Sequence, residues 1–177
     1  MRRAHVTLNK RLAVCAALAA IAAPVAAQVK RVGPETSPIL QAAVVPAGTE
    51  IVYVSGITPP ALNAGATPGT APSFGDTKTQ TVGVLTRIQD ILKGQGLTMG
   101  DVFMMRVLLV GDPAKGGGMD FAGMNEGYRQ FFATPAQPNK TARITSQVAA
   151  LVQPGMFVEI EVQAARPPSA APAAKRP

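Results

Sequence analysis

The chain has very little histidine and cysteine, because each occurs once among 177 residues, as His5 and Cys15. Both lie in the first 27 residues, which have the features of a secretory signal peptide: a basic start, an unbroken apolar run over 12–23, and small residues at 25–27. That run is well short of the roughly 20 apolar residues that a bilayer span needs. We therefore expect cleavage near Ala27, a periplasmic or secreted protein, and no stable membrane anchor.

Cleavage near Ala27 would leave a protein with neither histidine nor cysteine. Histidine-assisted nucleophilic triads, thiol catalysis, disulfides, and metal sites built on thiolate or imidazole are then excluded. The absence of a free thiol also suits an oxidising compartment. Any chemistry must use arginine, lysine, carboxylate, hydroxyl or backbone groups.

The positive net charge of +7 comes from the two ends of the chain. Four of the 17 basic residues precede Gln28 and three follow Ala165, so the remaining ten match the ten acidic residues. A central part without net charge does not present the basic surface typical of nucleic-acid-binding proteins. We expect no nucleic-acid partner.

The composition divides the remaining chain into three parts. Residues 28–38 are expected to be a loose leader, residues 39–166 a single domain, and residues 167–177, which are mainly Pro and Ala, a disordered tail. The domain is long enough to bury roughly two-thirds of its chain surface.

The pattern along the domain predicts an α+β fold. Strands are predicted over 39–45 and 49–55, and an irregular loop with four prolines and three glycines over 57–75. A helix should begin at Thr77, with Gln80 completing a capping box, and end near Gly96. An apolar strand over 102–110, a helix capped by Asp120 and two closing strands complete the order β-β-α-β-α-β-β, with both helices on one face of a mixed sheet.

The two closing strands, within 140–151 and 155–166, carry the most specific chemistry. Alternation places Arg143 with Thr145 on one face of the first strand, and Glu159 with Glu161 on one face of the second. We predict that Arg143 and Glu159 share the sheet face that the helices leave open. Arginine beside glutamate can hold a small carboxylate and steer a water molecule. A mixed apolar and charged face fits a subunit interface, or else an ordinary solvated face.

Several spaced motifs resemble the Rid (YjgF) family of enamine and imine deaminases. They are Ile-Val-Tyr-Val-Ser-Gly at 51–56, Asn125-x-x-Tyr128-x-x-Phe-Phe, Ala-Arg143 followed by Gln-Val-Ala-Ala-Leu at 147–151, and Val-Glu-Ile-Glu at 158–161. The resemblance runs from about residue 39 to residue 165. It implies a chorismate-mutase-like fold, a homotrimer around a central sheet barrel, clefts between subunits, and no cofactor or metal.

The resemblance also implies roles for single residues. Arg143 takes the position that binds the substrate carboxylate, and Glu159 the position that orders the hydrolytic water, while backbone groups of Gly56 and Thr145 line the pocket. Ile39 stands where active members usually have a tyrosine. The implied reaction is hydrolysis of a short-chain 2-imino or 2-enamino acid to a 2-keto acid and ammonia. The alternative is a non-catalytic periplasmic protein that binds small carboxylates or holds damaged proteins.

Overall fold

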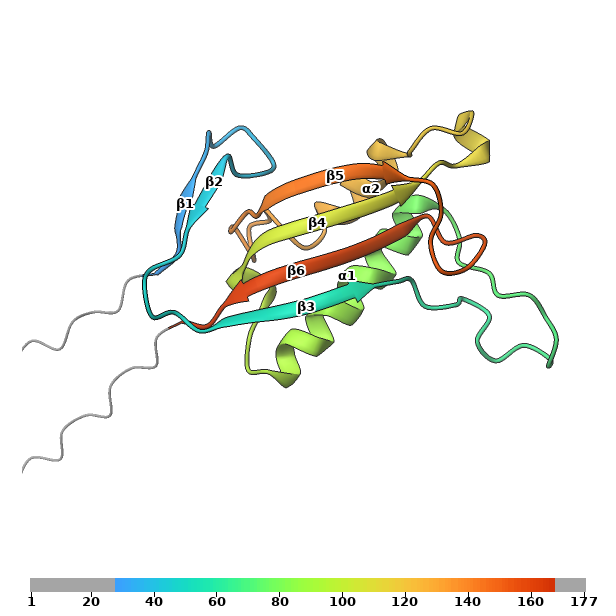
Figure 1. Ribbon diagram of the computed structural model, residues 1–177, viewed down its shortest axis with the longest axis horizontal. Helices are drawn as coiled ribbons and strands as arrows, with labels where there is room; N and C mark the ends of the chain where they lie inside the picture. The colour runs from blue at the N-terminus through green and yellow to red at the C-terminus, as the bar shows by residue number, and fades with distance from the viewer. Residues whose placement is uncertain (1–27, 168–177) are drawn as a thin grey trace, which may run out of the picture. The chain divides into compact units, whose positions relative to one another are not determined.

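Four strands form the main sheet of the computed structural model, which describes residues 28–167. They are β3 (Ile51–Ile57), β4 (Val102–Val110), β5 (Ala142–Val148) and β6 (Val158–Ala165), in the spatial order β3-β6-β4-β5. β6 pairs antiparallel with both β3 and β4, whereas β5 pairs parallel with β4 and lies at the edge. Figure 1 shows this sheet with both helices on its far side. The predicted signal peptide lies outside the described residues, as does the tail beyond Pro167.

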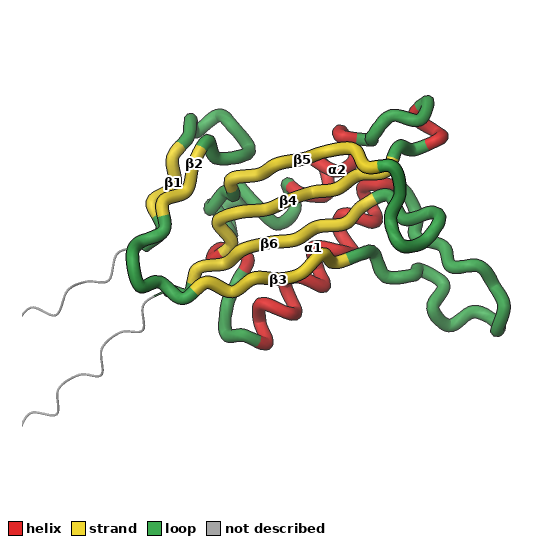
Figure 2. The backbone as a smooth tube through the Cα atoms, viewed as in Figure 1, coloured by secondary structure: helices red, strands yellow, loops and turns green. Residues whose placement is uncertain are grey.

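The helices α1 (Thr77–Gly94) and α2 (Phe121–Tyr128) cover one face of the sheet, as predicted (Figure 2). α1 is amphipathic because Leu85, Ile88 and Leu92 recur at helical spacing, and all three are fully buried. They pack in one core with alternate residues of the strands, including Val107 and Ile160. The α+β class and the mixed sheet are therefore confirmed.

The start of α1 differs from the prediction in its cap. Asp76, not Thr77, is the N-cap, and its carboxylate accepts a 2.7 Å hydrogen bond from the Thr79 amide. Hydrogen bonding by the Thr79 side chain and amide lowers the pKa of Asp76. Gln80 does not reach back to the cap. Its buried amide donates to the carbonyls of Gly75 and Gly155 and accepts from the Phe157 amide at 2.6 Å. Gln80 therefore joins the helix to the turn that leads into β6.

The leader predicted to be loose contains a strand. β1 (Lys30–Val32) pairs antiparallel with β2 (Ala42–Val44), so the first predicted strand is shorter than expected and has an upstream partner. Arg31 donates to the carbonyls of Gly100 at 2.8 Å and Val102 at 3.0 Å, and also to that of Lys140. These bonds fasten the hairpin to the start of β4 and to the segment that precedes β5.

The loop between β3 and α1 is irregular, as predicted, but it is closely attached. Pro59 and Phe74 are buried, and Arg87 of α1 donates to the Thr58 carbonyl at 2.8 Å. Asn63 bridges the loop by bonding the Ala71 carbonyl and the Ser73 amide. Two connections contain single 3₁₀ turns, at Met99–Asp101 and Pro113–Lys115.

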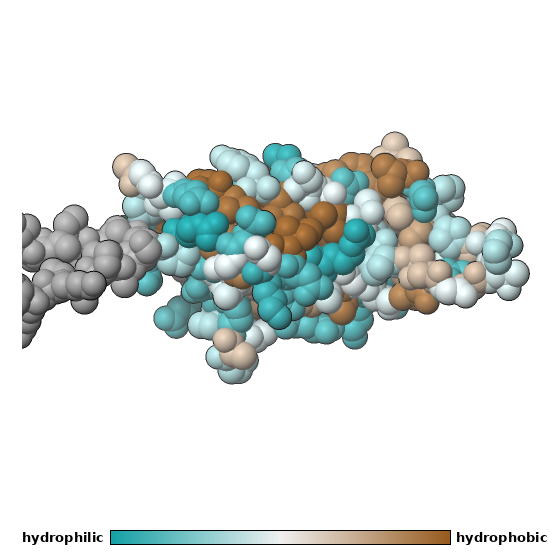
Figure 3. Space-filling view, turned by 90° about the horizontal axis from the view of Figure 1, so that it is seen from below, coloured by the Kyte–Doolittle hydropathy of each residue, from teal (hydrophilic) through white to brown (hydrophobic). Residues whose placement is uncertain are grey.

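The surface mixes apolar and polar areas. Seen from the side of β3 and α1, Figure 3 shows brown apolar patches among teal polar ones. Within residues 28–167, no helix has both the length and the apolar character that crossing a bilayer requires.

Candidate functional site

Arg143 and Glu159 lie on opposite faces of the sheet, which corrects the prediction that they share the open face. Arg143 pairs with buried Met105 of β4 and therefore projects toward the helices. Glu159 pairs with Leu108, one row further along the open face from Arg106 and Glu161. In β5, Ile144 is on the open face, where it is 49% exposed.

The wrong assignment has a physical reason. Alternation gives two rows of residues on a strand; in β5 one row is Arg143, Thr145 and Gln147, which are all polar, and the other is mostly apolar. Because charge favours exposure, the sequence alone predicts the polar row on the open side. β5 is an edge strand, however, and α2 supplies polar and aromatic groups that accept an arginine on the covered side.

Arg143 is clamped by four residues of α2. Its Nη2 donates to Asn125 Oδ1 at 2.8 Å, and its Nη1 makes a weaker bond to Met124 Sδ at 3.7 Å. The guanidinium carbon lies 4.6 Å from the centre of the Tyr128 ring and 5.7 Å from that of Phe121. Both distances are within the range of cation–π attraction. The plane of the guanidinium is thus fixed by contacts that are all neutral.

The charge of Arg143 is not balanced by an acid among residues 28–167. Other cations there do have carboxylate partners, such as Arg106 with Glu161 at 2.7 Å and Arg166 with Glu50 at 3.1 Å. Burial lowers the pKa of Arg143, and the nearby Tyr128 raises it by a smaller amount. The guanidinium remains protonated at working pH. A half-buried cation with only neutral partners makes Arg143 a candidate position for an anion.

Thr145 lies two residues along the same row as Arg143. Its hydroxyl is buried and has no hydrogen-bond partner among the described residues. Gln147, the next residue of the row, is occupied: its side chain bonds the Gly117 carbonyl at 3.2 Å and the Met119 amide at 3.0 Å. An unsatisfied buried hydroxyl is costly. Because Thr145 pairs with buried Val107 on the covered face, a ligand held by Arg143 would reach this hydroxyl only if neighbouring side chains moved.

Glu159 lies against Gly56 on the open face. A Cβ atom at residue 56 would overlap the Glu159 carboxylate, so the absence of a side chain on Gly56 makes room for it. Glu161, two residues along β6, is neutralised by Arg106. Glu159 has no ion pair or side-chain hydrogen bond within the described residues. The structure thus brings Gly56 and Glu159 together, and it separates them from Arg143 and Thr145.

Within one chain, a small ligand cannot contact both Arg143 and Glu159. Glu159 and Arg143 are two strands and about three residues apart, roughly 14 Å between backbones, and they point to opposite sides. A ligand of amino-acid size cannot touch both. The site of a single chain is therefore two half-sites: a cation half-site of Arg143, Thr145 and α2, and a carboxylate half-site of Glu159 and Gly56.

The side chain of Ile39 serves in packing. Its side chain is partly buried against the hydrophobic core, and it brings no hydroxyl to the cation half-site. The buried Tyr128 has its hydroxyl on the Pro38 carbonyl at 3.2 Å and on Thr141 at 3.3 Å. That hydroxyl is engaged with the protein, and Tyr128 presents its ring to Arg143.

Asn125 contacts Arg143, but the sequence did not predict this role for it. It appears in one of the motifs, yet no function followed from the spacing. The available signal was an asparagine inside a helix, a place that its side chain disfavours.

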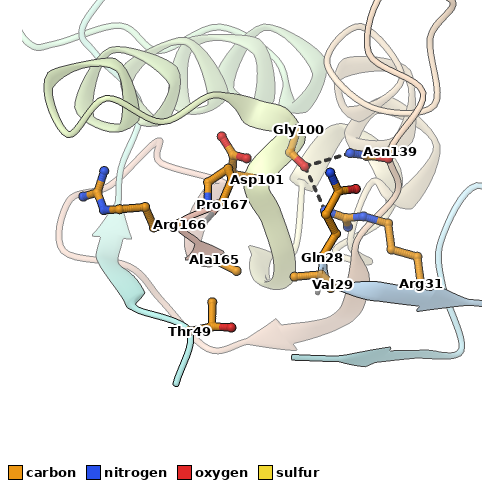
Figure 4. A pocket seen from close by; sticks show the side chains of 10 residues that line it. All are labelled: Gln28, Val29, Arg31, Thr49, Gly100, Asp101, Asn139, Ala165, Arg166 and Pro167. Atoms are coloured by element: carbon orange, nitrogen blue, oxygen red, sulfur yellow. Dashed lines mark hydrogen bonds between the residues drawn. The ribbon is translucent and has the colours of Figure 1, made fainter. Parts of the chain in front are cut away.

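The cavity drawn in Figure 4, of about 260 Å³, contains none of the predicted site residues. Its polar groups already have partners. Arg31 and Asn139 both donate to the Gly100 carbonyl, Asp101 accepts from Thr98, and Arg166 bonds Glu50 and the Gln95 carbonyl. Within residues 28–167, acidic residues do not gather in groups of three or more that could hold a metal ion.

Comparisons with known proteins agree with this fold. A family model described as endoribonuclease L-PSP matches residues 34–166. The crystal structure of Escherichia coli TdcF with bound serine is 28% identical, with a TM-score of 0.52 over 77% of this chain and 98% of that one. The E. coli YjgF gene product is 27% identical, with a TM-score of 0.51 over 77% and 98%. The Rid-family protein YyfB of Yersinia pestis has the same fold at 24% identity, with a TM-score of 0.60 over 79% and 100%. No match was found among curated proteins.

Proposed function

Because the chain belongs to the Rid (YjgF) family, we propose that it is a hydrolytic deaminase of short-chain 2-imino and 2-enamino acids. The products would be a 2-keto acid and ammonia. Arg143 would bind the substrate carboxylate, Glu159 would order the water, and Gly56 and Thr145 would line the pocket.

The observation that carries this proposal is the state of Arg143. Its guanidinium is half-buried, held in one plane, and without a negatively charged partner among the described residues. A carboxylate would supply that charge through two parallel hydrogen bonds, the geometry that a guanidinium offers best. The serine in the similar TdcF structure is a carboxylate-bearing ligand of suitable size.

We propose further that the complete site forms between copies of the chain in a homotrimer. The two half-sites are on opposite faces of one sheet, so a second chain must complete each site. The open face is suited to contact with another chain: Tyr53 is 71% exposed, Ile144 is 49% exposed, and Leu108 is half-buried. In a closed ring, every copy would supply Arg143 to one neighbour and Glu159 to the other.

The proposed mechanism needs only positioning and one proton acceptor. An imine carbon is electrophilic, so a water held by Glu159 can attack it while Arg143 fixes the carboxylate. Glu159 takes a proton from the water as the new C–O bond forms. The proton then passes to nitrogen, which gives a carbinolamine. A second transfer through Glu159, from the new hydroxyl to the amino group, lets the C=O bond form as the C–N bond breaks, so that ammonia leaves and the keto acid remains.

The test is the release of ammonia and pyruvate from freshly generated 2-iminopropanoate. We expect the wild-type chain to accelerate release above the rate in buffer, and Arg143→Ala to remove the acceleration. Equal rates for the two proteins would contradict the proposal.

A second candidate function is binding without turnover, either of small carboxylates or of damaged proteins. Ile39 favours it, because this residue places packing carbon where active relatives usually have a tyrosine hydroxyl. Carboxylate binding or suppression of aggregation, with no ammonia release above the rate in buffer, would identify this function. Export remains a prediction, and the N-terminal sequence of the protein from a periplasmic fraction would test cleavage near Ala27.

A further inference from the structure

Asn125 is fixed at both ends of its side-chain amide. Its Nδ2 donates to the Phe121 carbonyl one turn back at 3.0 Å, and its Oδ1 accepts from Arg143 at 2.8 Å. The first bond determines which amide atom faces the guanidinium. The oxygen therefore has one orientation, aimed at Nη2 of Arg143.

An asparagine at this place needs an explanation. Asn125 lies inside α2, where asparagine costs about 0.5 kcal/mol relative to alanine, because its side chain competes with the helix for hydrogen bonds. The residue is half-buried, and its amide oxygen lies against the guanidinium. What it contributes must come from its contact with Arg143.

The contact leaves most of the guanidinium available. Arg143 has five N–H donors, and within the described residues two of them have partners, Asn125 and the weak acceptor Met124 Sδ. The guanidinium carbon lies over the rings of Tyr128 and Phe121, and neither contact is a hydrogen bond to an N–H donor. Three donors thus remain for a ligand in a plane that is already set.

The acceptor is also neutral. A carboxylate in its place would make a stronger bond, but it would neutralise the charge that attracts the ligand. The neutral amide orients Arg143 and leaves its charge unbalanced.

We propose that Asn125 is a positioning residue for carboxylate binding: it fixes the plane of Arg143 while keeping its full positive charge for the ligand. This inference rests on the proposed function, in which Arg143 binds the substrate carboxylate. It assigns to α2 the task of presenting the arginine.

The discriminating variant is Asn125→Asp, which keeps the shape and the acceptor oxygen, adds one negative charge and loses the bond to the Phe121 carbonyl, as Asn125→Ala also does. It should hold Arg143 at least as firmly, yet weaken ligand binding. Asn125→Ala removes the acceptor and leaves the charge of Arg143 unbalanced. The matched control is Gln89→Glu, which changes an exposed amide of α1 to an acid away from the half-site.

The experiment is calorimetric titration of each full chain with pyruvate, a stable 2-keto acid. We expect Asn125→Asp to lower affinity at least about tenfold, Asn125→Ala to lower it about threefold, and Gln89→Glu to leave it unchanged. In assays with 2-iminopropanoate, the Asn125→Asp effect should fall on KM more than on kcat. Circular dichroism and size-exclusion chromatography check that the fold and assembly are retained.

The outcomes separate this inference from the proposed function. Pyruvate binding that is lost in Arg143→Ala but is unchanged in Asn125→Asp would overturn the positioning role alone. A wild-type protein that does not bind pyruvate would overturn both. If Asn125→Asp does not fold, Asn125→Ala decides: unchanged affinity contradicts the role, and lowered affinity with unchanged kcat supports it.

Discussion

The two half-sites differ in how much of their environment one chain supplies. Arg143 is hydrogen-bonded to Asn125, and its guanidinium carbon lies over the rings of Tyr128 and Phe121, so the single chain already holds it in place. Glu159 has room over Gly56 but no ion pair or side-chain hydrogen bond among the described residues. Under the proposed function, binding is therefore built into the single chain, whereas the position of the Glu159 carboxylate depends on a second chain or on the substrate.

The largest expected effect follows from removing the cation. Arg143→Ala should lower kcat/KM for 2-iminopropanoate by about 1,000-fold, because two charge-assisted hydrogen bonds of roughly 2 kcal/mol each are lost. The kcat/KM of Arg143→Lys should lie between those of the wild type and Arg143→Ala, since lysine keeps the charge but loses the planar guanidinium. Steady-state kinetics measure both, with Arg87→Ala as the control. A lysine variant as active as wild type would show that charge alone suffices and that the contacts of the guanidinium with α2 are not needed.

Glu159→Gln should give the next largest effect. The substitution keeps the shape of the side chain and removes the proton acceptor, so we expect kcat to fall about 100-fold while the affinity for pyruvate stays unchanged. The comparison is with Glu161→Gln on the same strand, which loses the ion pair to Arg106 and should retain turnover. If both variants lost activity equally, the assignment of the water to Glu159 would be wrong.

Gly56→Ala should give a smaller effect of the same kind. The added methyl group displaces the far end of a flexible side chain, so the carboxylate of Glu159 moves and the fold remains. We expect kcat to fall about tenfold, as a misplaced catalytic group predicts, with the thermal midpoint nearly unchanged. Gly65→Ala, where a Cβ would meet open space, is the matched control. Full activity in Gly56→Ala would mean that the position of Glu159 over Gly56 is not the working one.

Much of the fold could be predicted from the sequence, because it follows from periodicity. Leu85, Ile88 and Leu92 define a helix face, and the alternation of Val158, Ile160 and Val162 identifies the buried side of β6. The β1–β2 hairpin was not predicted, because it lacks such periodicity. Three-residue strands carry almost no pattern, and the carbonyls that hold Arg31 belong to distant segments.

The site could be predicted only in part. The motifs indicated Arg143 and Glu159, but alternation alone did not say which row of β5 faces α2. Tertiary contacts decide that, since Asn125 and the Tyr128 ring make the covered side acceptable for a guanidinium. The role of Asn125 depends on a 2.8 Å contact between residues 18 positions apart, which no local pattern encodes.

Subunit complementation tests the central claim, that each site takes Arg143 from one chain and Glu159 from another. Arg143→Ala and Glu159→Ala proteins, each inactive alone, are mixed at equal amounts under conditions that exchange subunits, and mixed assemblies are verified by mass spectrometry. Random mixing in a closed ring should restore sites with both native residues, giving about one quarter of wild-type activity. Verified mixed assemblies with no recovered activity would contradict the shared site.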